Sequence, residues 1–265
     1  MKKTATSFSD RPVSRAWHAR WIGPIPEPET GTRALFRREL SLEDPSACTL
    51  FISAERDYEL YINGRFVSRG VPPSPYYYKY YDELDLTNVL HPGLNSVAVL
   101  VSRIGATVTG LLVELVDSKG NLMLASDESW RVTTRTGWSI TDRLSGVENT
   151  QFQEYFDAKR HPQGWHTQAF DDSAWPFAAP YPPLGSSNCP WPRMVPRRIP
   201  QLAERDVLPE TVTAIEEGLD IISRYRREST SVVLSATGRP LTHSRLENAN
   251  ALCSEEGETI LQVST

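Results

Sequence analysis

The sequence predicts a mainly β protein, an antiparallel β-sandwich, and three observations support this fold class. Residues 34–135 contain roughly eight strand-like segments separated by closely spaced turns. No long stretch of this region has a helical period of apolar residues. The 20 prolines cluster at 24–28, 72–75, 176–183 and 190–200, and such clusters mark loops because proline cannot donate to a β-ladder.

The first predicted strands are "ALFRREL" (34–40) and "ACTLFISAE" (47–55). In the second of them, Leu50, Ile52 and Ala54 share one face, because alternate residues of a strand point the same way. This alternation is typical of a strand whose two faces have different surroundings.

The segment "YELYINGRFVSRG" (58–70) predicts a β-hairpin that turns through Asn63-Gly64. A type I′ turn needs positive φ at both central positions, which Asn-Gly tolerates best. A two-residue turn then predicts three cross-strand pairs, namely Ile62 with Arg65, Tyr61 with Phe66 and Leu60 with Val67.

Three further segments complete the predicted sandwich. "LNSVAVLVSR" (94–103) is apolar on nearly both faces and predicts a central buried strand. "GLLVELVDSKGNLMLASD" (110–127) predicts a hairpin that turns through 117–120, and "ESWRVTTR" (128–135) predicts one more strand.

After about residue 180 the composition changes. A proline-rich stretch predicts an extended connection. Beyond it, the spacing of Val212, Ile215, Leu219 and Ile222 favours a helix, although Gly218 and a high β-branched content count against one. In the polar tail, "SVVLS" and "TILQVS" are candidate short strands.

Composition and charge exclude several classes of protein. The net charge of −5 is mild and the basic residues are scattered, so neither a nucleic-acid partner nor a membrane partner is expected. Cys48, Cys189 and Cys253 have no CxxC spacing and suggest no disulfide framework. The N-terminus lacks the apolar stretch of a signal peptide, and we expect a cytoplasmic protein.

An ordered set of motifs resembles the N-terminal region of bacterial α-L-rhamnosidases, the inverting glycoside hydrolases of family 78. The most specific combination is "EYFDAKRHPQGW" (154–165) followed by "FDDSAW" (170–175). That family usually has Arg directly after "DA", where this chain has Lys159 and then Arg160. The preceding motifs, in order, are "ARWI", "FRREL", "YELYINGRFVSRG", "YYDELDLTNVLHPGLNSVAVLV" and "SDESWRV".

The resemblance implies a galactose-binding-like jelly roll and a catalytic (α/α)6 barrel further along a longer enzyme. This sequence has no such barrel, so we expect an N-terminal fragment or a truncated or split gene product, without catalytic residues. The predicted organisation is a flexible N-terminus, a β-sandwich, a proline-rich connection and an incomplete C-terminal segment, over residues 1–16, 17–180, 181–208 and 209–265 respectively.

Aromatic residues supply the carbohydrate-binding candidates, which are Tyr77, Tyr78, Tyr81 and Trp165. The apolar face of a pyranose stacks on such rings. The competing interpretation is that these rings pack in the core or against a neighbouring domain, because Tyr is enriched at interfaces. In a strand, successive tyrosines of the run at 72–85 would point to opposite faces.

Asp171 and Asp172 are the metal candidates, because carboxylate oxygens ligate calcium. The competing interpretation is that Asp171 shapes a turn before Trp175. Asp157, close to Lys159 and Arg160, is expected to form a surface ion pair. The five histidines lack a zinc-ligand spacing. No cofactor other than calcium is expected.

These observations lead to one functional expectation and two alternatives. The chain is expected to be a non-catalytic accessory region of an α-L-rhamnosidase-like glycoside hydrolase, with a rhamnoside and the missing catalytic domain, or another chain, as partners. The alternatives are a free-standing lectin-like carbohydrate-binding module and a purely structural interaction domain.

Overall fold

The computed structural model describes residues 15–27, 32–74, 78–103, 108–140, 154–201, 211–218 and 258–264. The chain divides into two compact units, Met1–Pro200 and Gln201–Thr265. All regular elements in the described ranges are β-strands, which confirms the predicted mainly β sandwich. Within the same ranges, no helix is long and apolar enough to cross a membrane.

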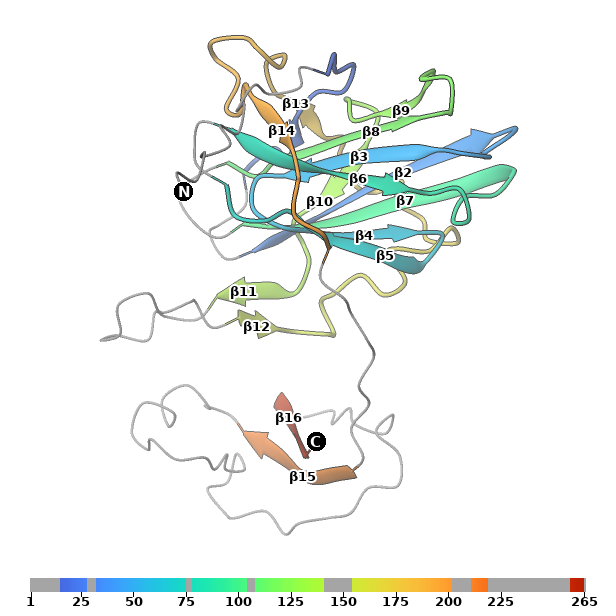
Figure 1. Cartoon of the computed structure of the whole chain (residues 1–265). Coiled ribbons are helices and arrows are strands. Elements are labelled where there is room, and N and C mark those ends of the chain that lie inside the picture. Colours follow the sequence, from blue (N-terminus) through green and yellow to red (C-terminus); the bar gives the residue numbers. More distant parts are fainter. Residues whose placement is uncertain are drawn as a thin grey trace, which may run out of the picture. The chain divides into compact units, whose positions relative to one another are not determined.

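One layer of the first unit is a seven-stranded sheet, counted over the described residues (Figure 1). Its order is β13-β1-β8-β3-β6-β14, and β9 pairs with β8. The pairs are antiparallel except that of β14 with β6, so the sheet is mixed. Its strands are β1 (Ile22–Gly23), β3 (Thr49–Ala54), β6 (Lys79–Asp85), β8 (Leu111–Val116), β9 (Leu122–Ala125), β13 (Ala179–Pro180) and β14 (Met194–Pro196).

The other layer is an antiparallel sheet of five described strands in the order β10-β2-β7-β4-β5. Its central strand is β7, which is buried from Asn95 to Ser102, as the apolar run predicts. A separate two-stranded ribbon pairs β11 (Trp138–Ile140) with β12 (Glu154–Phe156). The strands of the five-stranded sheet are β2 (Arg33–Leu42), β4 (Tyr58–Ile62), β5 (Arg65–Gly70), β7 (Gly93–Ser102) and β10 (Arg131–Thr133).

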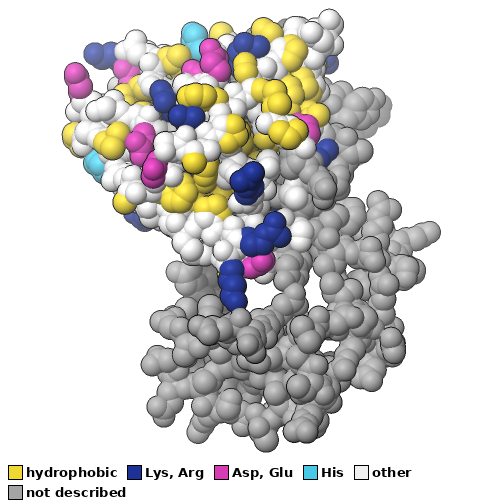
Figure 2. All heavy atoms as spheres, turned by 180° about the vertical axis from the view of Figure 1, so that it is seen from behind, with side chains coloured by type: hydrophobic (Ala, Val, Ile, Leu, Met, Phe, Trp, Pro, Cys, Tyr) yellow, Lys and Arg dark blue, Asp and Glu magenta, His cyan; other side chains and the backbone are white. Residues whose placement is uncertain are grey.

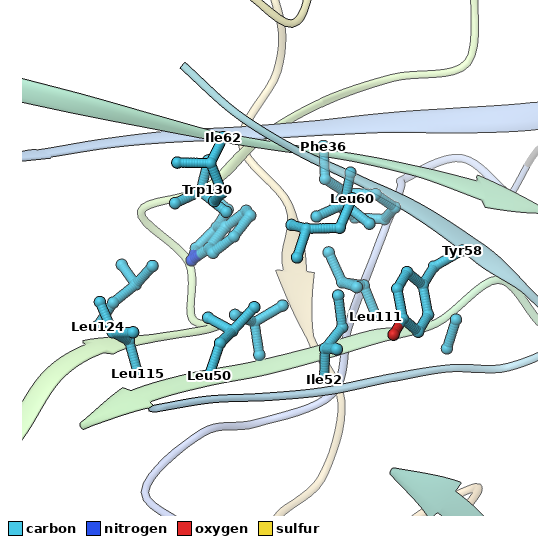
Figure 3. Close-up of a cluster of buried hydrophobic side chains, with 14 of the residues drawn as sticks. Phe36, Leu50, Ile52, Tyr58, Leu60, Ile62, Leu111, Leu115, Leu124 and Trp130 are labelled. Carbon is cyan, nitrogen blue, oxygen red and sulfur yellow. The ribbon is translucent and has the colours of Figure 1, made fainter. Parts of the chain in front are cut away.

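The main core lies between the two sheets, where alternate residues of each strand meet (Figure 3). Leu50 and Ile52 of β3 face Leu60 and Ile62 of β4, and Trp130 fills one side. Burying each such side chain stabilises the fold by about 1.5–3 kcal/mol.

The hairpin formed by β4 and β5 has the predicted turn. Asn63 has φ 53° and Gly64 has φ 83°, so both central residues are left-handed. The predicted pairs of Ile62 with Arg65 and of Tyr61 with Phe66 are confirmed. The third predicted pair is wrong.

Leu60 lies opposite Ser68, not Val67. The register shifts between Leu60 and Tyr61, so that Val67 is an extra residue on β5. Such a bulge twists an edge strand, and β5 is the last strand of its sheet.

The side chain of Asn63 fastens this turn to the central strand. Its Nδ2 donates to Asn95 Oδ1 at 2.9 Å, and its Oδ1 accepts from the Ser96 amide at 2.8 Å. Gln168 Nε2 also donates to Asn63 Oδ1, at 3.1 Å. The residue that permits the turn therefore also fixes its position.

The proline-rich stretch predicted as a connection is built into the first unit as far as Pro200. Met194–Pro196 forms the edge strand β14, and Trp191 is buried against Trp21, with 4.5 Å between ring centroids. The Trp191 ring passes so close to Gly110 that a Cβ there would lie 2.2 Å from it. Prolines end the strands here, but the residues between them still pack.

In the second unit, β15 (Thr211–Gly218) pairs antiparallel with β16 (Glu258–Ser264). The predicted helix over this region is therefore wrong, whereas the candidate strand "TILQVS" is confirmed. A register shift between Val212 and Ala214 explains the error, because an extra residue gives a strand the three-residue spacing of a helix. The other candidate strand, "SVVLS" (231–235), lies outside the described residues.

A buried carboxylate links the two sheets to the chain after β14. Asp82 of β6 is 1 % exposed and accepts a hydrogen bond of 2.6 Å from Tyr58 Oη of β4. Arg197 Nη1 donates to Asp82 from 3.2 Å. Burial, followed by the neighbouring Asp82 charge, raises the pKa of the Tyr58 hydroxyl well above its ordinary value.

We expect Tyr58→Phe to lower the free energy of unfolding by about 1–3 kcal/mol, because a buried carboxylate then loses a short hydrogen bond. Urea denaturation followed by tryptophan fluorescence measures the change. Tyr80→Phe is the matched control, since the Tyr80 hydroxyl lies 3.1 Å from the half-buried Tyr78 hydroxyl. If Tyr58→Phe and Tyr80→Phe lowered the free energy of unfolding equally, the hydrogen bond to Asp82 would have no special role.

Candidate functional site

The outer face of the five-stranded sheet is covered by residues His161–Trp175, here named the covering segment. Leu35, Ala98 and Leu100 point outward from β2 and β7 and form a second apolar cluster with Trp165. These parts of β2 and β7 are therefore buried on both faces.

Arg37, in the middle of β2, binds the covering segment to the sheet. Its side chain is 1 % exposed. Its Nε donates to Asp172 Oδ2 at 2.9 Å, and its Nη1 donates to the carbonyls of Thr167, at 2.8 Å, and of Trp165. The Phe170 carbonyl accepts from Nη2 at 3.4 Å. A planar guanidinium with five donors suits this convergence of acceptors.

The "FDDSAW" motif forms the end of this cover. Asp171 Oδ1 accepts from the Ser173 amide at 2.9 Å in a local turn. Hydrogen bonding by the Ser173 side chain, followed by that of its amide, lowers the pKa of the Asp171 carboxyl. The Trp175 amide donates to the Asp172 carbonyl at 2.9 Å. The two adjacent carboxylates thus serve different bonds, one within the turn and one to Arg37.

Aromatic rings continue from the covering segment onto the hairpin. Tyr61 lies 5.1 Å from His166 and 5.7 Å from Phe66, with interplanar angles of 42° and 71°. Phe66 is 40 % exposed. Burial, followed by the neighbouring Glu59, raises the pKa of Tyr61 to about 12. Because the rings are tilted, they do not form a flat platform.

The outer face of the seven-stranded sheet is covered by Arg15–Trp21, here named the N-terminal strap. Glu114 of β8 is fully buried, and its Oε2 accepts from the backbone amides of His18, at 2.7 Å, and Ala19, at 2.9 Å. Arg15 of the strap pairs with the other oxygen of the same carboxylate. Arg37 therefore anchors the covering segment, and Glu114 anchors the N-terminal strap.

Rings of the strap and the sheet also stack. The Arg15 guanidinium lies 3.6 Å from the centre of the Phe51 ring, and Trp17 packs edge-on to Tyr81 at 5.1 Å. Tyr80 and Tyr81 point to opposite faces, Tyr80 toward the main core and Tyr81 toward the strap, as strand alternation predicts.

The structure does not bring the predicted carbohydrate residues together. Tyr81 and Trp165 are 3 % and 4 % exposed and lie on the outer faces of different sheets, each under its cover. Tyr78 is half-buried, and Tyr77 lies outside the described residues. Sugar contact by these four residues stays a prediction.

Calcium ligation by Asp171 and Asp172 also stays a prediction, which the geometry does not favour. Ca²⁺ takes six to eight oxygen ligands, and Asp172 already faces a guanidinium. In the described part of the chain, no three His, Cys, Asp or Glu side chains gather as a metal site. Asp157 accepts from the Lys159 amide at 3.0 Å, which makes it part of a turn.

A sequence profile of the α-L-rhamnosidase N-terminal domain matches residues 43–199, more than half of the chain. The chain belongs to this family. The match includes β3 to β14, the covering segment and the "FDDSAW" motif.

Full-length relatives agree with this assignment. An α-L-rhamnosidase of Formosa agariphila is 28 % identical over 63 % of this chain, and one of Streptomyces avermitilis is 27 % identical over 91 %. These matches cover 20 % and 24 % of the relatives' own lengths. The chain thus spans about a quarter or less of these enzymes.

Solved structures support the same fold. A rhamnosidase of glycoside hydrolase family 78 from Bacillus sp. GL1 superposes with a TM-score of 0.67 at 30 % identity, over 77 % of this chain and 22 % of that one. An α-L-rhamnosidase from Aspergillus terreus gives a TM-score of 0.56 at 25 % identity, over 75 % of this chain and 24 % of that one.

Sequence patterns alone did not single out the two anchoring charges, Arg37 and Glu114. A signal was present for Glu114, which is the lone charge within the apolar run "LLVELV". A charged residue in a strand buried on both faces needs a buried partner, so this position predicts an anchor. Arg37 is harder to identify from the sequence, because Arg38 follows it directly and the motif does not show which of the two arginines is buried.

We expect Arg37→Met to destabilise the α-L-rhamnosidase N-terminal domain by about 3–5 kcal/mol, because it leaves Asp172 and three carbonyls without their donor. Urea denaturation measures the loss. Arg65→Met, at an exposed position on β5, is the control and should change stability by less than about 0.5 kcal/mol. Similar stabilities of the two variants would contradict the anchoring role.

Proposed function

We propose that this chain is a non-catalytic accessory region of an α-L-rhamnosidase-like glycoside hydrolase that cleaves terminal α-L-rhamnosides. The observation that carries the proposal is the family match to the N-terminal domain, together with a span of about a quarter or less of the relatives. In this proposal the sandwich docks on a catalytic domain and orients it.

The carboxylates support a non-catalytic role. Inverting hydrolysis needs an acid and a base separated by room for a water molecule. Glu114 and Asp82 are buried and held by Arg15 and Arg197, and Asp172 is held by Arg37. These groups are engaged in structural bonds.

The test is hydrolysis of an aryl α-L-rhamnoside by the purified 265-residue chain. We expect no release of rhamnose above that of a heat-denatured sample, whereas a full-length α-L-rhamnosidase in the same assay releases it. Turnover that survives repurification of the chain would overturn the non-catalytic proposal.

A second candidate is a carbohydrate-binding module, favoured by the exposed end of the aromatic row. Phe66 and the half-buried Tyr61 lie on the same hairpin as Asn63, whose amide side chain is bonded to that of Gln168. An aromatic ring next to amides is a composition that suits sugar recognition, although the tilt of the rings limits stacking.

Calorimetry with L-rhamnose and galactose, with and without calcium, tests this second candidate. If the hairpin contacts sugar, Phe66→Ala should weaken binding by about tenfold, the loss of one stacking contact. Phe177→Ala is the matched control, because Phe177 is 56 % exposed and is bridged to β10 at the opposite edge of the sheet. No heat at millimolar sugar would argue against this candidate.

A further inference from the structure

Two histidines of the covering segment flank its buried tryptophan. The His166 ring lies 5.8 Å from Trp165 and 5.1 Å from Tyr61 of β4. The His161 ring lies 6.5 Å from Trp165, on which it packs edge-on. The His166 imidazole thus belongs to the contact between the cover and the sheet, whereas His161 Nδ1 lies 2.7 Å from the Thr136 carbonyl and the His161 ring packs on Phe156.

The charges around His166 are mainly positive. Arg37 faces it from β2, and His161 faces it from the covering segment itself. From β4 it meets Tyr61, whose hydroxyl donates to Glu59 at 2.9 Å, and Arg69 of β5 acts on the same tyrosine. Glu59 also lies 3.9 Å from Arg33.

The nearby carboxylates are already engaged. Asp172 and Glu39 both pair with Arg37, at 2.9 Å and 3.4 Å, and Glu59 is shared between Tyr61 and Arg33. Among the described residues, no hydrogen bond or ion pair joins His166 to a carboxylate. A proton added to His166 would therefore place a second cation near the buried guanidinium without a new counterion.

We propose that the covering segment is a pH-sensitive device, in which protonation of His166 loosens the cover from the five-stranded sheet while the sandwich stays folded. The cover is suited to move separately, because it consists of turns and loops without a ladder to the sheet. Arg37, the Gln168 side chain, the bond from Arg131 to the Trp175 carbonyl and one apolar cluster bind it there. This inference goes beyond the accessory role and does not depend on it.

The direction of the pH dependence follows from proton linkage. Burial, followed by the charges of Arg37 and His161, lowers the pKa of His166 below its ordinary value of 6.5 in the closed state. When the segment opens, His166 regains its ordinary pKa and binds protons more readily. The cover is therefore held fully above about pH 6.5 and less firmly as the pH falls below it.

Opening would uncover an apolar sheet face. Leu35 and Ala98 are fully buried beneath the cover, and Leu100 is 5 % exposed. Released Trp165 would leave the same cluster. Acid pH would thus change the surface that this domain offers to a partner.

Hydrogen–deuterium exchange of the full chain at pH 5.0, 6.0 and 7.5, corrected for the intrinsic exchange rate, tests the proposal. Peptides spanning 161–170 should open several-fold more at pH 5.0 than at pH 7.5, because the open state binds the proton of His166 more readily than the closed state. Peptides from β3 and β8 should not change. Equal protection of 161–170 at all three pH values would overturn the proposal without any variant.

His166→Gln removes the titrating ring and should abolish the acid-dependent opening. His18→Gln is the matched control, because the His18 side chain is 65 % exposed and lies on the N-terminal strap, so it should keep the wild-type response. If His166→Gln retained the acid-dependent opening, His166 would not be the sensor and the proposal would fail.

Discussion

The placement of the covering segment over the five-stranded sheet depends on one buried group, the Arg37 guanidinium. A sandwich buries the inner faces of its sheets against each other, but here the outer faces are apolar as well. They need covers, and loops lack a ladder to fix their position. Arg37 fixes one cover because its donors match acceptors at only one placement of the segment. Glu114 does the same for the N-terminal strap, with the opposite charge.

Because the covers bury much of both outer faces, the large apolar side chains that stay exposed lie elsewhere. Ile25, Phe177 and Ile199 are among the most exposed large apolar side chains described, and all three lie in loops that border strands. Figure 2 shows one face of the molecule, on which hydrophobic side chains gather toward the upper right with Lys and Arg scattered around them. Four further exposed large apolar side chains of the described residues lie near strand ends, so the exposed apolar surface is spread over loops and strand ends. They are Phe66, Leu94, Leu122 and Phe156.

Sequence patterns correctly predicted the features of the fold that depend on residues close together in the chain. Asn63-Gly64 specified its turn because only a few residues tolerate positive φ, and the apolar run at 94–103 specified a central strand. Local patterns failed at two β-bulges, one at Val67 and one after Val212. Each bulge inserts one residue into a strand and so changes the spacing of the residues around it. At Val67 the bulge shifted a pair, and at Val212 it imitated a helical period. Gly218 and the β-branched residues of this segment counted against a helix, but the prediction followed the apolar spacing instead.

The candidate site residues could not be placed from sequence, because their burial depends on covers that are distant along the chain. Tyr81 is hidden by Trp17, and Trp165 lies over β2 and β7. The family motifs have the same physical origin. "FRREL" supplies the donor Arg37, while "QGW" and "FDDSAW" supply acceptors at Trp165, Phe170 and Asp172. The ordered appearance of these motifs therefore reflects the residues that hold the covering segment on the five-stranded sheet. It identifies the family through the chemistry of its fold.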